Sequence, residues 1–126
     1  MTKFLGFTAI EAAQATAIAD LQERIHSGNI KAGWYDNPRE DGTILCLIHS
    51  EISEAMEGVR KGIQDDHLPH RPMVEVELAD AVIRILDYAG FKGLDVAGAI
   101  FEKLNYNAHR ADHKRENREK DGGKKF

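Results

Sequence analysis

Residues 73–89, MVEVELADAVIRILDYA, restrict the possible fold more than any other segment. At 100° per residue, four polar side chains of this expected helix fall on one narrow stripe: Glu77, Asp80, Arg84 and Asp87. Apolar residues cover most of the remaining circumference, and such a helix requires burial on nearly all sides. Either the polar stripe is the only solvent face, or it lines an internal site and the excess apolar surface contacts another copy of the chain.

Helical periodicity recurs in four segments, and no period-2 strand pattern accompanies it. Capping chemistry supports the ends, with a capping-box spacing from Thr8 to Glu11 and an N-cap at Asp95. Four helices with short connections predict an all-α four-helix bundle, formed as one domain over residues 1–126 with a basic, flexible tail at 118–126. The expected helices run from Thr8 to about Gly28, from about Thr43 to Lys61 with a stop at Gly62, from Pro72 to just before Gly90, and from Asp95 to the glycines that follow Asp121.

Composition places the chain among soluble globular proteins, with 42% hydrophobic and 30% charged residues. One cysteine, Cys46, excludes an intrachain disulfide and fits a reducing compartment. The sequence has no secretory signal and no stretch long enough to span a membrane, so we expect a cytoplasmic protein without a membrane partner. The net charge of −4 argues against nucleic acid as the main partner, although residues 109–126 carry +3.

The second helical segment places a carboxylate on its apolar stripe. Glu51 lies within about 20° of Ile44 around the helix axis, and Glu54 lies on the flank of the same stripe. An ionised carboxylate on a core-facing stripe is costly unless it is paired or bound to a metal. Glu51 therefore needs a partner from elsewhere in the fold.

Side-by-side packing of the second and third helices would bring Glu51 and Glu54 towards Glu77 and Asp80. Four adjacent carboxylates repel one another strongly, and a divalent cation relieves the repulsion. Ligands that are all oxygen favour a hard ion, Mg²⁺, or Mn²⁺ as a substitute. A salt-bridge ladder through Arg84 to Asp80 and Asp87 is the alternative explanation of the stripe.

The fourth segment offers groups that suit phosphate. Lys103, Asn107 and Arg110 recur at i, i+4 and i+7, so they share one helix face. A carboxylate-bound Mg²⁺ keeps room for phosphate oxygens, and cationic and amide groups would hold them. Taken alone, this spacing is also common on solvated surfaces.

The ordered set E-x-x-E followed by E-x-x-D resembles the MazG-like, all-α nucleoside triphosphate pyrophosphohydrolases. The stretches LIHSEISEAMEGVRKG, VEVELADAVIRILDYAGFKGLD and KLNYNAHR...GGKKF are also similar to that family, so the likeness covers roughly residues 43–126. It implies metal-dependent hydrolysis of a nucleoside triphosphate to the monophosphate and pyrophosphate, in a homodimer or homotetramer. Ser50 stands where many relatives carry an acid.

The resemblance also assigns roles to individual residues. Glu51 and Glu54 are the catalytic candidates, one of them activating the attacking water. The implied metal ligands are Glu51, Glu54, Glu77 and Asp80. The implied substrate-binding residues are Lys103, Asn107, Arg110 and Lys124 of the basic tail.

The nucleobase site is the least defined part of the sequence. Trp34 or Tyr35, in the loop expected at residues 28–42, would stack on a base or cover the core. Asp65 and its neighbours in the next connection are expected to be solvated. The resemblance, and no particular residue, favours a purine deoxynucleotide such as dGTP or dATP as the substrate. A dUTP- or dUDP-type hydrolase and a non-catalytic helical-bundle interaction protein remain alternatives.

Overall fold

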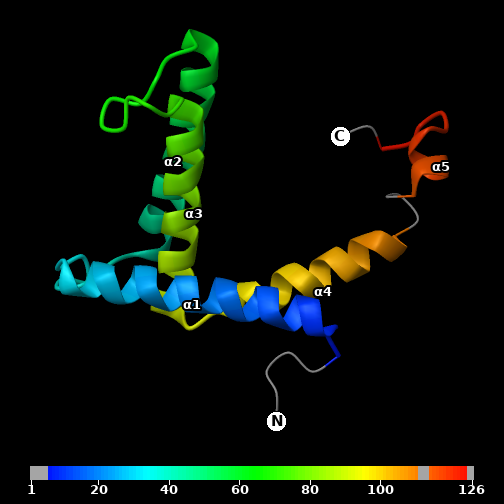
Figure 1. Ribbon diagram of the computed structural model, residues 1–126, viewed down its shortest axis with the longest axis horizontal. Coiled ribbons are helices and arrows are strands. Elements are labelled where there is room, and N and C mark those ends of the chain that lie inside the picture. Colours follow the sequence, from blue (N-terminus) through cyan, green and yellow to red (C-terminus); the bar gives the residue numbers. More distant parts are fainter. Residues whose placement is uncertain (1–5, 111–113, 125–126) are drawn as a thin grey trace. The chain divides into compact units, whose positions relative to one another are not determined.

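The computed structural model describes residues 6–110 and 114–124. All of the regular secondary structure in these residues is helical (Figure 1). These residues contain no strand, only an isolated antiparallel bridge between Gln64 and Pro72. The predicted all-α class is therefore confirmed, while the four-helix bundle and the oligomer stay predictions. The helices are α1 (Ala9–Lys31), α2 (Asp41–Lys61), α3 (Met73–Lys92), α4 (Val96–His109) and α5 (Arg115–Arg118).

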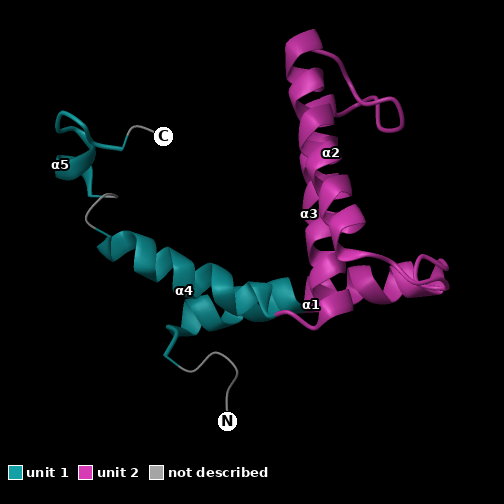
Figure 2. Ribbon diagram, turned by 180° about the vertical axis from the view of Figure 1, so that it is seen from behind, with its two compact units in different colours: residues 1–19, 95–126 teal, residues 20–94 magenta. Residues whose placement is uncertain are grey.

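Two compact units divide the chain (Figure 2). Unit 2 comprises residues 20–94, with the second half of α1, α2 and α3. Unit 1 comprises the residues up to Ala19 and those from Asp95 onward, with the start of α1, α4 and α5. Of the basic tail predicted at 118–126, residues 125 and 126 lie outside the described residues.

In unit 2, α2 and α3 pack side by side (Figure 1). Gly58 of α2 lets the two helices approach closely, because a Cβ added at this position would lie only 2.9 Å from the Cβ of Met73. Each helix ends at a glycine in the left-handed region, Gly62 with φ 60° and Gly93 with φ 66°, as expected for C-terminal caps. The buried apolar residues of this unit are Ile44, Ala55, Ala81, Leu86 and Ala89.

The second half of α1 contacts α3 through polar side chains. The buried carboxylate of Asp87 lies 2.9 Å from His26 Nδ1 and accepts a hydrogen bond from the Tyr35 hydroxyl at 2.6 Å. Gly90 permits the approach, since a Cβ there would lie 2.6 Å from the Cβ of His26. These contacts join α1, the loop after it and α3.

Unit 1 is built on the predicted caps. Thr8 and Glu11 form the reciprocal capping box, with each backbone N–H donating to the other side chain at 3.1 Å. Asp95 accepts a hydrogen bond from the backbone N–H of Gly98 at 3.0 Å, which confirms it as the N-cap of α4. The core of the unit is Ala15, Ala97 and Phe101.

Three predicted helix ends are wrong. The first helix continues through Gly28 to Lys31, and the third continues through Gly90 to Lys92. A glycine inside a helix costs only about 1 kcal/mol, so packing overrides it. The fourth helix ends at His109 instead of reaching the glycines after Asp121, because Arg110 has an extended backbone with ψ 134°.

Candidate functional site

Three carboxylates from α2 and α3 meet on the packed faces of these helices. Oxygen atoms of Glu51, Glu77 and Asp80 all lie within 4.8 Å of one another. Glu51 is buried, and Glu77 and Asp80 are half-buried. Glu54, one turn after Glu51, is more exposed but lines the same cavity. The structure therefore brings the four predicted metal ligands into one cavity, with three of them in a compact acid cluster.

Arg84 is the cation of this cluster. Its Nε donates a hydrogen bond to Oε1 of Glu51 at 2.7 Å, from α3 to α2. The expected ladder from Arg84 to Asp80 and Asp87 is not the arrangement found, because Asp87 instead contacts α1 and the following loop. Burial of Glu51 is thus already compensated by an arginine, and its position alone does not require a metal.

Burial and neighbouring charges shift the pKa values of the acids in this cluster. Burial raises the pKa of Glu77 to about 8, and hydrogen bonding and repulsion from Glu51 and Glu54 act in the same direction. Burial and the charge of Glu51 also raise the pKa of Asp80. Burial opposes ionisation of Glu51, but hydrogen bonding with Arg84, Glu77 and Glu54 outweighs the effect of burial and lowers the pKa of Glu51. Glu77 therefore holds a proton at neutral pH and donates it towards its neighbours.

The acids line one side of a cavity of about 650 Å³. The connection after α2 forms another part of the wall, and it is ordered by Asp65, which accepts hydrogen bonds from the backbone N–H groups of His67 at 2.9 Å and Leu68 at 2.8 Å. The expectation that Asp65 is solvated is wrong, since only 6% of it is exposed. Its position two and three residues before its donors is the local pattern that could have indicated this turn.

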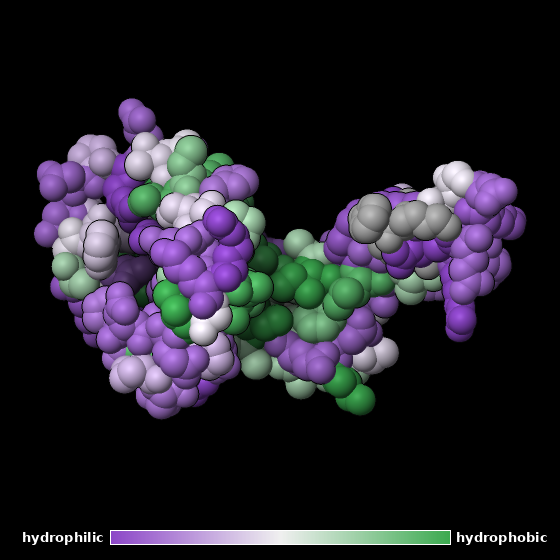
Figure 3. Space-filling model, turned by 90° about the horizontal axis from the view of Figure 1, so that it is seen from above, coloured by the Kyte–Doolittle hydropathy of each residue, from purple (hydrophilic) through white to green (hydrophobic). Residues whose placement is uncertain are grey.

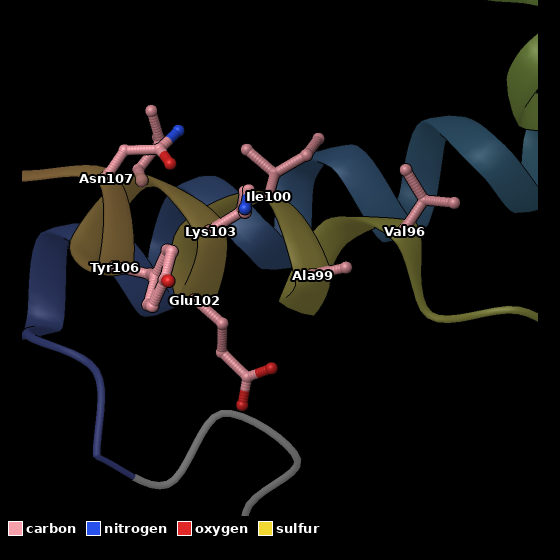
Figure 4. Close-up of a pocket in the computed structure, with 8 residues that line it drawn as sticks. Val96, Ala99, Ile100, Glu102, Lys103, Tyr106 and Asn107 are labelled. Atoms are coloured by element: carbon pink, nitrogen blue, oxygen red, sulfur yellow. The ribbon is translucent and has the colours of Figure 1, made fainter. Parts of the chain in front are cut away.

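Lys103, Asn107 and Arg110 come together around Tyr106 at the end of α4, in unit 1. The Lys103 ammonium lies 4.6 Å and the Arg110 guanidinium 5.7 Å from the centre of the Tyr106 ring. Arg110 Nη1 also donates to Asn107 Oδ1 at 3.5 Å. Lys103 and Asn107 line a largely apolar pocket of about 770 Å³ on α4 (Figure 4).

Lys124 lies close to α5 in the same unit. Its backbone carbonyl accepts a hydrogen bond from Arg118 Nε at 2.9 Å. This contact folds the described end of the chain back onto α5. The predicted phosphate-binding residues thus belong to unit 1, and the acids belong to unit 2.

Of the two loop aromatics, Trp34 is the exposed one. It is 58% exposed, with the Arg39 guanidinium 6.0 Å from its ring centre. Tyr35 instead covers the core, with its ring against His26 at 4.9 Å and Phe91 at 4.8 Å. Tyr35 has a structural role here, which leaves Trp34 as the candidate for base stacking.

Sequence reasoning gave one cationic group near the acids the wrong partners and overlooked a second. Arg84 was assigned to the wrong partners, because spacing within α3 offers Asp80 and Asp87 but does not reveal a residue on α2. Lys61 lines the same cavity as the acids. Its i+7 spacing from Glu54 is the sequence signal that could have identified this lysine.

Comparisons with protein-family models, with curated proteins and with solved structures found no match. Across the described residues, none of the helices is long and apolar enough to cross a membrane. The chemistry of the site therefore rests on its residues: a hard-oxygen donor set, one arginine, and a carboxylic acid protonated at neutral pH.

Proposed function

We propose that the protein is a Mg²⁺-dependent nucleoside triphosphate pyrophosphohydrolase of the MazG-like type. The observation that supports this most is the acid cluster, in which Glu51, Glu77 and Asp80 lie within 4.8 Å while the pKa of Glu77 is raised to about 8. Strongly perturbed acids grouped in a cavity are typical of functional sites. Carboxylate oxygens are also the ligands that Mg²⁺ and Mn²⁺ prefer.

The cluster would hold the metal through Glu51, Glu77 and Asp80, with Glu54 beside them. Bound Mg²⁺ would neutralise phosphate charge and make a bound water more acidic. Glu54 remains exposed within the cavity, so it is the carboxylate best placed to accept a proton from an attacking water. The water oxygen would bond to a phosphorus of the α–β bridge as the bond to the bridging oxygen breaks, which yields the monophosphate and pyrophosphate.

Release of pyrophosphate from a panel of ribo- and deoxynucleoside triphosphates, and of orthophosphate from dUDP, tests the proposal. We expect release with Mg²⁺ or Mn²⁺ and none with a chelator, with purine deoxynucleotides favoured. The double variant Glu77→Ala, Asp80→Ala should lose this activity, whereas Glu75→Ala, an exposed position on the same helix that pairs with Arg71, should retain it. Folded protein that binds metal and releases neither pyrophosphate from any triphosphate nor orthophosphate from dUDP would refute the enzymatic function.

A non-catalytic helical protein is the second candidate, and the Arg84–Glu51 contact favours it. In that case the acids and Arg84 join α2 to α3 as a structural network. Glu51→Gln separates the two functions. It should abolish metal binding and turnover in the enzyme while the fold persists, whereas in a structural protein it should change only stability.

A second copy of the chain is the proposed partner of the α2–α3 pair. Apolar residues on α2 form a stripe about 60° wide that remains 43–64% exposed, and a stripe on α3 is similarly uncovered. Such surface in a single chain favours homodimerisation or a homotetramer. Figure 3 shows hydrophobic side chains exposed on the face of the molecule that it draws. The stripes consist of Leu45, Ile52, Met56 and Val59 on α2, and of Leu78, Val82 and Ile85 on α3.

Light scattering coupled to size-exclusion chromatography tests this association. Val82→Glu should convert the oligomer to monomer, because it buries a charge in the interface. Ser53→Glu, exposed on another face of α2, is the matched control and should leave the oligomer intact. A wild-type chain that is monomeric at high concentration would contradict the proposed association.

A further inference from the structure

The cavity lined by Glu51, Glu54, Glu77 and Asp80, called the acid cavity below, is also lined by a lysine that has no role in the proposed function so far. Lys61, in the last turn of α2, lines the cavity together with the acids and the connection that follows the helix. A cavity walled by carboxylates alone would repel a polyphosphate. A lysine in the same wall supplies a positive charge on the same unit as the proposed metal ligands.

Helix geometry directs Lys61 towards the acids. Lys61 follows Glu54 by seven residues, so the two lie on the same face of α2 at a separation of about 10 Å along the axis. Long side chains in helices lean towards the N-terminus, which directs the lysine back along this face. Its Nζ indeed lies 3.2 Å from Oε1 of Glu57, one turn nearer to the acids.

Glu57, the ion-pair partner of Lys61, also pairs with Arg60. Glu57 also accepts a hydrogen bond from Arg60 Nη1, at 3.0 Å through its other oxygen. If Lys61 moved to a phosphate, Glu57 would keep Arg60 as its ion-pair partner. Exposed pairs of this kind contribute little to stability, so exchanging one for a phosphate contact costs little. Arg60 does not line the cavity and is itself an exposed side chain.

We propose that Lys61 binds the pyrophosphate portion of the substrate and holds it as the leaving group. This inference rests on the proposed function for its substrate class and adds a binding residue that lies in the same compact unit as the acids. Lysine suits the role because its ammonium is a compact charge on a flexible chain with three donors. The leaving pyrophosphate gains negative charge as the bridging bond breaks, and a nearby cation stabilises that charge.

Lys61→Met and Arg60→Met test the proposal as a matched pair. Both remove an exposed cation that contacts Glu57, but only Lys61 lines the cavity. Isothermal titration of inorganic pyrophosphate into the full chain with saturating Mg²⁺ gives a readout independent of turnover. We expect Lys61→Met to weaken pyrophosphate binding about tenfold to a hundredfold, as for loss of a charge-assisted hydrogen bond, and Arg60→Met to change it less than about twofold.

Two further measurements separate failure of the inference from failure of the proposed function. Mn²⁺ affinity in the absence of phosphate should be retained by both variants, and pyrophosphate release from a nucleoside triphosphate should fall only in Lys61→Met. Equal pyrophosphate binding by Lys61→Met and wild type, equal weakening in Arg60→Met, or no pyrophosphate binding by wild type would overturn the inference. Lysine-dependent pyrophosphate binding without turnover of any nucleotide would support the binding site and refute the hydrolase.

Discussion

Binding of Mg²⁺ to the acid cluster should release a proton from Glu77. The pKa of this carboxyl is raised to about 8, first by burial and then by the neighbouring Glu51 and Glu54. One pH unit below the pKa, roughly nine in ten molecules carry the proton. A metal ligand must be deprotonated. Binding should therefore release about 0.9 proton per Mg²⁺ at pH 7, about 0.5 at pH 8 and about 0.1 at pH 9.

The affinity for Mg²⁺ should follow the same titration. Well below pH 8, each unit of rising pH should strengthen binding about tenfold through Glu77, and the effect should level off above pH 9 or so. The raised pKa of Asp80 acts in the same direction at lower pH. The dissociation constant should therefore fall steeply between pH 6 and pH 8 and change little beyond.

Calorimetric titration of Mg²⁺ at pH 7 in two buffers with different ionisation enthalpies measures the released proton directly. Glu77→Gln should release almost none and bind the metal weakly, whereas Glu75→Gln on the exposed face of α3 should behave like the wild type. Metal binding to this cluster without proton release at pH 7, or with an affinity independent of pH from 6 to 8, would refute the reasoning.

Stability without metal should depend on the same proton. Because the folded pKa of Glu77 lies above its unfolded value of 4.5, the folded state binds more protons between pH 4.5 and about 8. The contribution is present in full below pH 4.5 and is lost as the pH rises to about 8. The lowered pKa of Glu51 acts in the opposite sense, but only in acid below about 4.5. Urea unfolding should show this decline in wild type and a smaller one in Glu77→Gln.

Substitutions elsewhere in unit 2 test the packing. Arg84→Ala should lower the free energy of unfolding by about 1–3 kcal/mol at pH 7, because it leaves Glu51 buried without its hydrogen bond; an unchanged urea midpoint would contradict this. Gly90→Ala should cost about 1–3 kcal/mol, since its Cβ would lie 2.6 Å from that of His26. Gly28→Ala, which meets nothing within 4 Å, should instead stabilise by about 0.5–1 kcal/mol in thermal unfolding.

Local chemistry made parts of the fold predictable from sequence. The capping box at Thr8, the N-cap at Asp95 and the C-terminal glycine at Gly62 each depend on residues within one turn, so their patterns were sufficient. The same rule predicts a helix end at Gly90, which is wrong. Its actual role depends on His26, 64 positions earlier in the chain, and no local pattern reveals that approach.

The candidate site likewise has features that the sequence predicts and features that depend on packing between helices. Helical phase was enough to predict that Glu51, Glu77 and Asp80 meet, because consecutive helices commonly pack together. The partner of Arg84 was not predictable, since spacing along α3 offered two acids and only the packing of α2 selects Glu51. The phosphate-binding roles assigned to Lys103, Asn107 and Arg110 stay predictions.

Charge balance is the property of the acid cluster that favours a metal site over a purely structural network. Glu51, Glu77 and Asp80 lie together, and Arg84 provides one compensating charge through Glu51. Burial and the surrounding negative charge leave Glu77 protonated at neutral pH, which reduces the repulsion. In the proposed metal-bound state a divalent ion would replace that proton, while Arg84 would keep its hydrogen bond to Glu51. The proton on Glu77 therefore lets the three carboxyl groups lie together, and the proposed metal would take over that role from the proton.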